Sequence, residues 1–217
     1  MLRRLEAFID RIASVRVLIV CSVLLAAVLV SVQVLDLPWS LPRLKQISGG
    51  TGILDMKFHY SALEAYRTLN ALGAEGRRFY LVRILGGIDV LLPLLMAFLL
   101  SVAITLVMRR SYRRVRWLKL VPFAATLIDY LENTVIAVLL LTYPERHLSL
   151  AAAAGWITTT KFVVYWCSCL IVIGWVVFNL LTARKRINSR NNRNAEINSR
   201  KVTVFPRQGR SDDGQTG

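Results

Sequence analysis

Four long apolar runs, separated by shorter polar segments, dominate the pattern of hydrophobic and polar positions along the chain. They cover residues 17–35, 80–108, 118–142 and 148–182. Each run reaches about 20 residues or more, which is the length an α-helix needs to cross the hydrocarbon core of a bilayer. The pattern therefore predicts four membrane-spanning helices, which together form one membrane domain over residues 17–182.

The segment before the first apolar run, residues 1–16, is short and amphipathic and carries four arginines. A cleaved secretory signal is the alternative for this beginning of the chain. The apolar stretch is too long for a typical signal, and no clear cleavage site of small residues follows it. We therefore expect an uncleaved anchor.

Residues 36–79 form the longest connection between two apolar runs. Its first part, "DLPWSLPRLKQISGGTG", is rich in proline and glycine and predicts an irregular loop. Its second part, "YSALEAYRTLNALG", predicts a short amphipathic helix that stops at Gly73. The apolar positions of this helix recur every three residues, at Leu63, Tyr66, Leu69 and Leu72.

The composition agrees with a membrane protein and adds an orientation. Of the 217 residues 55% are hydrophobic, yet the formal net charge is +15. Of the 28 Lys and Arg residues, 19 lie in residues 1–16, 109–119 and 184–217, which share one side of the membrane if the chain crosses four times. Basic flanks stay in the cytoplasm, so we expect both termini there and the 36–79 connection outside.

The same charge bears on partners and on localisation. A nucleic-acid-binding protein can be equally basic, but it does not contain four apolar runs of span length. We expect the lipid bilayer as the partner, with anionic head groups at the basic rim, in a bacterial inner membrane. The tail, residues 183–217, is basic and has no apolar periodicity, which predicts a disordered cytoplasmic segment.

Polar residues interrupt the third apolar run in "DYLEN". Asp129, Glu132 and Asn133 have the spacing i, i+3, i+4, so they share one helix face, which should point into the bundle. If spans three and four form a hairpin, Lys161 lies opposite Tyr130 and can reach both carboxylates. Thr158 and Thr159 come level with the same stripe, as further hydroxyl donors.

The second span supplies a third acid, Asp89, about one helical turn from the level of Glu132. Pro93 removes a backbone hydrogen bond and is expected to kink this span. Arg83 either snorkels to the surface or reaches back to Asp89. Intramembrane ionisable groups mark functional sites by default, although such groups also fasten helices to one another. The candidate ligand or proton site comprises Asp89, Asp129, Glu132, Asn133 and Lys161.

Two other groups of polar residues lie near the outer surface. Arg77 and Arg78 could attract an anion toward the polar set, but interfacial anchoring explains them more simply. Asp55, His59 and Glu64 are the ligand types of a metal site. With only two histidines, far apart, such a site is improbable, and we expect neither a metal nor a cofactor.

The stretch from "ILDMKFHYSALEAYRTLNALGAEGRRFYL" onward resembles a family of four-span bacterial integral membrane proteins with no assigned activity. The resemblance rests on that loop helix, on "GRRFY" leading into a span with Asp89 and Pro93, on "DYLEN" and "YP", and on Lys161 after the threonines. It covers about two-thirds of the chain. It implies the four-span architecture and transfers no activity or ligand.

The sequence thus predicts an all-α, integral membrane four-helix bundle with an outer helical loop, and leaves three functions open. The first is binding or transport of a small ligand or protons by the polar cluster, reached from the outer side. The second is an intramembrane enzyme that acts on a lipid or prenyl substrate through Asp89 or Glu132. The third is a structural subunit in which the polar residues only clasp the helices.

Overall fold

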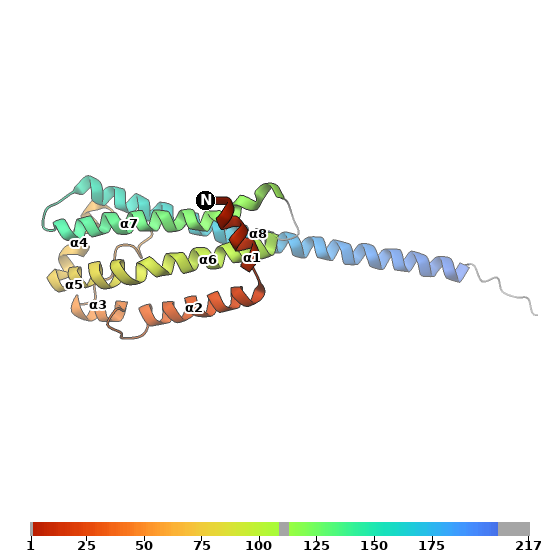
Figure 1. The fold of residues 1–217 in the computed structure, drawn as a ribbon, viewed down its shortest axis with the longest axis horizontal. Coiled ribbons are helices and arrows are strands. Elements are labelled where there is room, and N and C mark those ends of the chain that lie inside the picture. Colours follow the sequence, from red (N-terminus) through yellow and green to blue (C-terminus); the bar gives the residue numbers. More distant parts are fainter. Residues whose placement is uncertain (1, 109–112, 204–217) are drawn as a thin grey trace, which may run out of the picture. The chain divides into compact units, whose positions relative to one another are not determined.

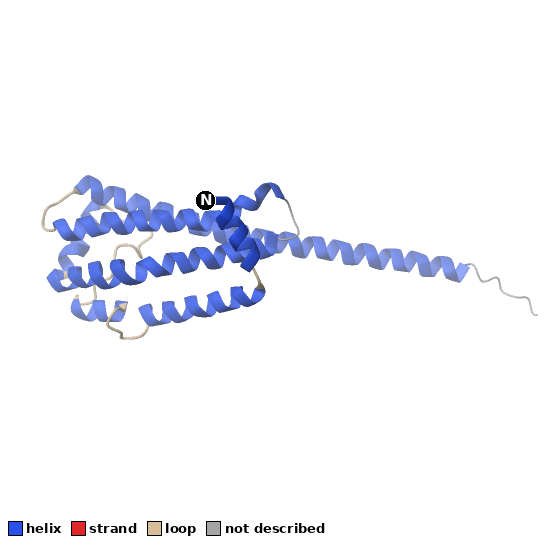
Figure 2. Ribbon diagram, viewed as in Figure 1, coloured by secondary structure: helices blue, strands red, loops and turns tan. Residues whose placement is uncertain are grey.

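The computed structural model describes residues 2–108 and 113–203, and helices form all the regular secondary structure of these residues (Figure 2). The elements are α1 (Leu2–Ile12), α2 (Val15–Gln33), α3 (Leu41–Ile47), α4 (Ala62–Ala71), α5 (Gly73–Phe79), the π-helix η1 (Tyr80–Ile88), α6 (Asp89–Met108), the 3₁₀ segment η2 (Arg113–Leu120), α7 (Val121–Thr142) and α8 (Leu148–Thr203). The predicted all-α fold is confirmed.

Within the described residues, four helical segments are long and apolar enough to cross a membrane: Val15–Gln33, Gly73–Met108, Trp117–Thr142 and Leu148–Ser189. They contain the predicted runs 80–108, 118–142 and 148–182 in full, whereas the first helix ends at Gln33, two residues before the predicted end at 35. The chain divides into two compact units, residues 1–175 and 176–217, and α8 passes from the first into the second. The site described below lies in the first unit.

In the first unit the apolar helices run alternately up and down, and α6 lies between α2 and α7 (Figure 1). One end, which we call the loop end, carries the connection between α2 and α5 and the turn between α7 and α8. The opposite end carries α1. There the buried Lys119 ammonium lies 2.6 Å from the Asp10 carboxylate of α1, which fastens α1 to the bundle.

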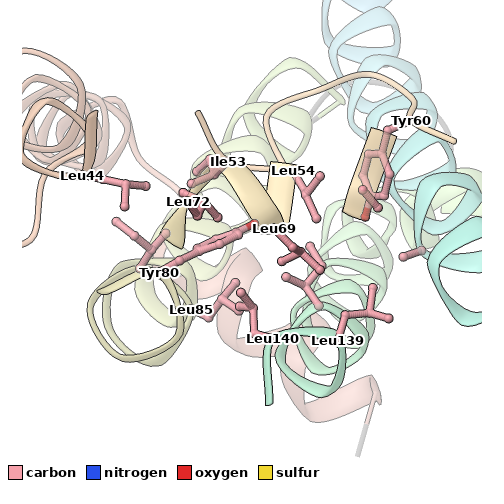
Figure 3. Close-up of a cluster of buried hydrophobic side chains, with 14 of the residues drawn as sticks. Leu44, Ile53, Leu54, Tyr60, Leu69, Leu72, Tyr80, Leu85, Leu139 and Leu140 are labelled. Carbon is pink, nitrogen blue, oxygen red and sulfur yellow. The ribbon is translucent and has the colours of Figure 1, made fainter. Parts of the chain in front are cut away.

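The hydrophobic core is concentrated at the loop end, where the connection packs over the helices (Figure 3). Side chains of the connection interdigitate with those of η1 and α7. The core includes Leu44, Leu54, Tyr60, Leu69, Leu72, Tyr80, Ile136 and Leu139, all almost fully buried. The connection is therefore part of the folded bundle and covers its loop end.

The first half of this connection differs from the prediction, because Leu41–Ile47 forms the helix α3 where an irregular loop was expected. Ser40 caps the helix: its Oγ accepts a hydrogen bond from the Arg43 N–H at 3.3 Å. Pro42 occupies the first turn, a position that proline favours. Gly49 follows at φ 63°, a left-handed conformation that suits glycine and ends the segment.

The amphipathic helix predicted in the second half is confirmed as α4. It begins with a capping box, in which Ser61 and Glu64 bond reciprocally to each other's backbone N–H groups. The Ser61 backbone N–H and hydroxyl lower the pKa of the Glu64 carboxyl. Gly73, at φ 65°, follows α4 as predicted. Leu63 is 56% exposed, however, so the buried stripe comprises Ala65, Tyr66, Thr68 and Leu69.

The fourth span also continues further than predicted. α8 reaches Thr203, so residues 183–203 are helical where a disordered tail was expected. No glycine or proline occurs between Gly174 and Pro206, and so nothing in the sequence breaks the backbone hydrogen-bond ladder earlier. The remaining part of that predicted tail, residues 204–217, lies outside the described residues.

Candidate functional site

The polar stripe of α7 points into the bundle, as its spacing predicts. Asp129, Glu132 and Asn133 are 7%, 0% and 9% exposed, although they occur in an otherwise apolar helix. Polar groups on a spanning helix face the interior because acyl chains offer them no hydrogen-bond partner. The burial of these three residues therefore requires partners on neighbouring elements.

Lys161 of α8 is the central partner. Its Nζ lies 2.9 Å from Asp129 Oδ1 and 2.5 Å from Glu132 Oε2, and it donates to the Asp55 carbonyl at 3.3 Å. An ammonium has three N–H donors, and here each has an acceptor. The predicted contact of Lys161 with both carboxylates is present, and the lysine has no donor left for a further group.

The two threonines next to Lys161 behave differently from each other. Thr158 donates to Glu132 Oε1 at 2.6 Å, so both oxygens of this carboxylate are engaged. Thr159 instead donates to the Phe58 carbonyl at 3.1 Å, and the expectation that it joins the acidic stripe was wrong. Successive residues on a helix point about 100° apart, and this rotation turns Thr159 toward the connection.

Asp55 belongs to the cluster although the sequence analysis treated it only as a weak metal ligand. The side chain is buried, and its Oδ1 accepts a hydrogen bond from the Tyr80 hydroxyl of η1. Its carbonyl binds Lys161. The one signal in the sequence was its apolar setting, since Ile53, Leu54 and Met56 surround a lone acid. A lone acid among apolar neighbours requires a buried polar partner.

Asp89 stands where the π-helix η1 passes into α6. One of its carboxylate oxygens, Oδ2, is buried and has no hydrogen-bond partner among the described residues. Arg83 is exposed, and the described residues include no ion pair between Arg83 and Asp89. The expected alternative in which Arg83 pairs with Asp89 is therefore not found. π-Helical turns occur frequently at functional sites. Beside this π-helix, Asp89 therefore presents an acceptor that no described residue engages.

Pro93 leaves a backbone carbonyl of α6 free to accept a hydrogen bond from α7. A proline cannot donate to the carbonyl four residues earlier, which here is that of Asp89. Asn133 Nδ2 donates to that carbonyl at 3.3 Å. Thr126 and Tyr130 donate to the carbonyls of Pro93 and Val90, at 3.0 Å and 2.6 Å. Three side chains of α7 therefore hold the backbone that positions Asp89.

We expect the roles of Asn133 and Pro93 to be coupled. Asn133→Leu should lower the free energy of unfolding by about 1–2 kcal/mol, because the Asp89 carbonyl, which is partly buried, then loses its side-chain donor. In a Pro93→Ala background the new backbone N–H supplies that carbonyl, so the same change should cost at least about 0.5 kcal/mol less. Thermal unfolding of the four purified proteins in detergent measures this difference. Equal costs in both backgrounds would contradict the assignment.

The connection is also pinned to α8 on the side of Gly155. His59 Nδ1 lies 3.2 Å from the Gly155 carbonyl and 3.1 Å from Thr159 Oγ1. The backbone of Tyr60 touches Gly155 directly, which leaves no room for a side chain there. Burial raises the pKa of the Tyr60 hydroxyl, which therefore stays neutral.

The residues considered for a metal site are held in three separate contacts. Asp55 pairs with Tyr80, His59 with α8, and Glu64 with Ser61. Within the described residues, no group of three or more His, Cys, Asp or Glu side chains has the arrangement to hold a metal ion. Asp55 thus belongs to the polar cluster, whereas His59 and Glu64 hold the connection in place.

The arginines near the loop end also have distinct settings. Arg77 donates to the Leu69 carbonyl at 2.9 Å and lies 4.0 Å from the centre of the Tyr143 ring. It therefore ties α5 to α4 and to the turn after α7. Arg78 and Arg83 are exposed. Of the three outer-side candidates, Arg77 has structural contacts that account for it.

A cavity of about 270 Å³ adjoins the polar cluster, and residues from all four apolar helices line it. We call it the acidic cavity, because Asp55, Asp89, Asp129 and Lys161 form its polar wall. The remaining wall is mainly apolar and includes Leu29, Val32, Ile84, Leu92, Met96 and Phe162. An apolar cavity with a few convergent polar groups is the usual form of a small-molecule site.

Comparison with known proteins adds no activity to this geometry. Scans against protein-family models, curated proteins and solved structures each found no match to the chain.

Proposed function

We propose that this chain is a multi-pass membrane protein that binds a small amphipathic ligand in the acidic cavity, with a cationic or hydrogen-bond-donating group at Asp89. The observation that carries the proposal is the buried Asp89 Oδ2 atom, which has no partner in the described part of the chain and belongs to a residue lining the cavity. A buried acceptor without a donor is costly, and a ligand that supplies the donor recovers that cost.

The charges of the cluster favour a cation. Four carboxyl groups, from Asp55, Asp89, Asp129 and Glu132, surround one ammonium, that of Lys161. If all four are ionised, the cluster carries three excess negative charges in surroundings of low dielectric constant. Such an excess requires compensation, either by protons or by a positively charged ligand. Lys161 is already saturated, so a ligand meets Asp89 first.

The cavity walls favour a ligand that also has an apolar body. An engineered cavity of about 150 Å³ holds one benzene molecule. At 270 Å³ the acidic cavity accommodates a larger apolar group, with aliphatic and aromatic side chains around it. Burial of that group contributes about 25 cal/mol for each Å² of apolar surface removed from water.

The Lys161 cluster and Asp89 have different roles in this proposal. Lys161, Asp129, Glu132 and Thr158 bond mainly to one another and clasp α7 to α8. Asp89 is held in place through its backbone, and its buried Oδ2 atom has no hydrogen-bond partner among the described residues. The helix clasp therefore supports the binding site. In this proposal the first and third functions left open by the sequence, ligand binding and a structural clasp, are parts of one arrangement.

The distribution of basic residues supports a location and an orientation for the protein. We propose a bacterial inner membrane with both termini in the cytoplasm and the loop end outward, since 19 of the 28 basic residues then lie inside. The ligand would enter from the outer side, where Asp55 and Met56 of the connection line the cavity. The resemblance to four-span bacterial membrane proteins agrees with this placement.

Binding of simple probes tests the proposal. Hexylammonium, hexanol and hexanoate have the same alkyl chain and differ in charge. We expect hexylammonium to bind the detergent-purified protein most tightly, and Asp89→Asn to weaken it about tenfold or more, because a charge-assisted hydrogen bond is lost. Titration calorimetry measures the affinities.

Glu75→Gln is the matched control, since Glu75 is an exposed acid at the start of the same apolar segment. This variant should bind hexylammonium like the unmodified protein. Equal affinity for hexylammonium and hexanol, or unchanged binding in Asp89→Asn with intact thermal unfolding, would refute the proposed function.

A further inference from the structure

A second cavity, of about 280 Å³, adjoins the acidic cavity at the loop end. Four residues line both cavities: Gln33, Leu41, Ile53 and Met56. The two spaces therefore border on the same residues, at the end of α2, the start of α3 and the connection before α4. A ligand in one of them touches the same side chains as a ligand in the other.

The second cavity has the opposite charge. Lys45 and Lys57 line it together with Thr51 and Gly52, and none of its lining residues is acidic. Lys57 Nζ donates to the neutral Thr68 hydroxyl at 3.3 Å, so that contact leaves its positive charge uncompensated. We call this space the basic cavity. The Thr51 hydroxyl is engaged, since it donates to the Ser48 carbonyl at 3.1 Å. The two ammonium groups are charged donors of the kind that anionic oxygens prefer.

Apolar side chains that line both cavities lie between the acidic residues of one cavity and the lysines of the other. Leu41 and Ile53 are 8% and 5% exposed and stand in the wall common to both cavities. The acidic side is held by Lys161 and Tyr80, through their contacts with Asp55. The two cavities together thus present a negative group, an apolar middle and two positive groups.

We propose that the ligand of this protein is a zwitterionic amphiphile, with an ammonium group at Asp89 and a phosphate group at Lys45 and Lys57. This inference rests on the proposed function, which it deepens by adding the anionic group. A phosphate suits the basic cavity because its several oxygens can accept from both lysines at once. The phosphate belongs either to a lipid head group or to a soluble phosphate ester.

A comparison of three soluble probes tests the inference on the unmodified protein. Hexylammonium carries the cation alone, hexyl phosphate the anion alone, and 6-aminohexyl phosphate carries both. We expect 6-aminohexyl phosphate to bind about tenfold more tightly than hexylammonium, since it adds charge-assisted contacts to the lysines. Titration calorimetry in detergent and at low salt gives the three affinities.

Lysine substitutions then locate the added affinity. Lys45→Gln and Lys57→Gln should reduce the advantage of 6-aminohexyl phosphate, together abolish it, and leave hexylammonium affinity unchanged. Arg67→Gln is the matched control, because it removes an exposed positive charge from α4 at the same end of the bundle. This variant should retain the full advantage.

The outcomes separate the two proposals. If hexylammonium binds through Asp89 but the phosphate adds no affinity, or if the lysine variants keep its advantage, the zwitterionic ligand is overturned while the proposed function stands. If hexylammonium itself does not bind, both fail. Native mass spectrometry of protein extracted from phosphatidylethanolamine-containing membranes distinguishes the two sources of phosphate. A lipid that stays bound to the protein supports a lipid head group. Protein that carries no lipid but binds 6-aminohexyl phosphate supports a soluble phosphate ester.

Discussion

Gly155→Ala should displace the connection between α2 and α5 from the bundle and lower the free energy of unfolding by about 3 kcal/mol. A Cβ atom at Gly155 would lie 2.0 Å from the Tyr60 carbonyl oxygen and 3.2 Å from its carbon. These are backbone atoms, so no side-chain rotation relieves the clash. Thermal unfolding in detergent measures the loss of stability.

The displacement should also affect the cavity. Asp55 and Met56 line the acidic cavity and precede Tyr60 by only a few residues, so a shifted connection opens its wall. We therefore expect hexylammonium affinity to fall together with stability. Trypsin should also cut the connection faster, at Lys45 or Lys57. Both side chains are already exposed, and local unfolding frees the backbone next to them for cleavage.

Gly174→Ala is the matched control on the same helix, since a Cβ atom there meets nothing within 4 Å. Alanine favours a helix over glycine by up to about 1 kcal/mol, so this control should be neutral or slightly stabilising. A Gly155→Ala protein with the stability and proteolysis pattern of the control would show that the connection does not pack against α8 in this way.

Lys161→Met should destabilise the protein by about 3–5 kcal/mol, because it leaves the buried Asp129 and Glu132 carboxylates without their cation. The Asp55 carbonyl loses a donor at the same time. The measurements are the amount of protein folded in the membrane and the thermal unfolding of what can be purified. Lys185→Met, at an exposed lysine of the same helix, is the control and should change neither.

Neutralising the acids should partly rescue this variant. In the triple variant Lys161→Met, Asp129→Asn, Glu132→Gln the unpaired charges are gone, and the amides retain hydrogen-bonding groups for Thr158 and Asn133. We expect it to be more stable than Lys161→Met alone. A triple variant that is less stable than the single one would contradict mutual pairing as the reason for the loss.

The sequence by itself determined the four apolar helices and the buried face of α7. Span length and hydropathy are local properties of a segment, and the spacing of Asp129, Glu132 and Asn133 defines a face on any helix. Lys161 was found as their partner because a short turn between two spans restricts which residues can lie level. These parts of the site require no knowledge of how distant segments pack.

Two helical segments were not predicted because the overall composition of each segment outweighed its individual start and stop residues. The proline and glycine content of residues 36–52 hid the cap at Ser40 and the favourable position of Pro42, which together begin α3. The polar composition of residues 183–203 favoured disorder, whereas a sequence free of glycine and proline continues the helix of span four. Composition over a window was in both segments a weaker guide than individual start and stop residues.

Only the tertiary structure decided that Asp55 belongs to the acidic cluster and where a ligand fits. Asp55 joins the cluster through Tyr80 and Lys161, residues 25 and 106 positions away, and the fold of the connection creates that proximity. The free oxygen of Asp89 and the two cavities depend on which neighbouring side chains are already engaged. Cavities arise from the packing of several elements at once, and the periodicity of a single segment does not predict that packing.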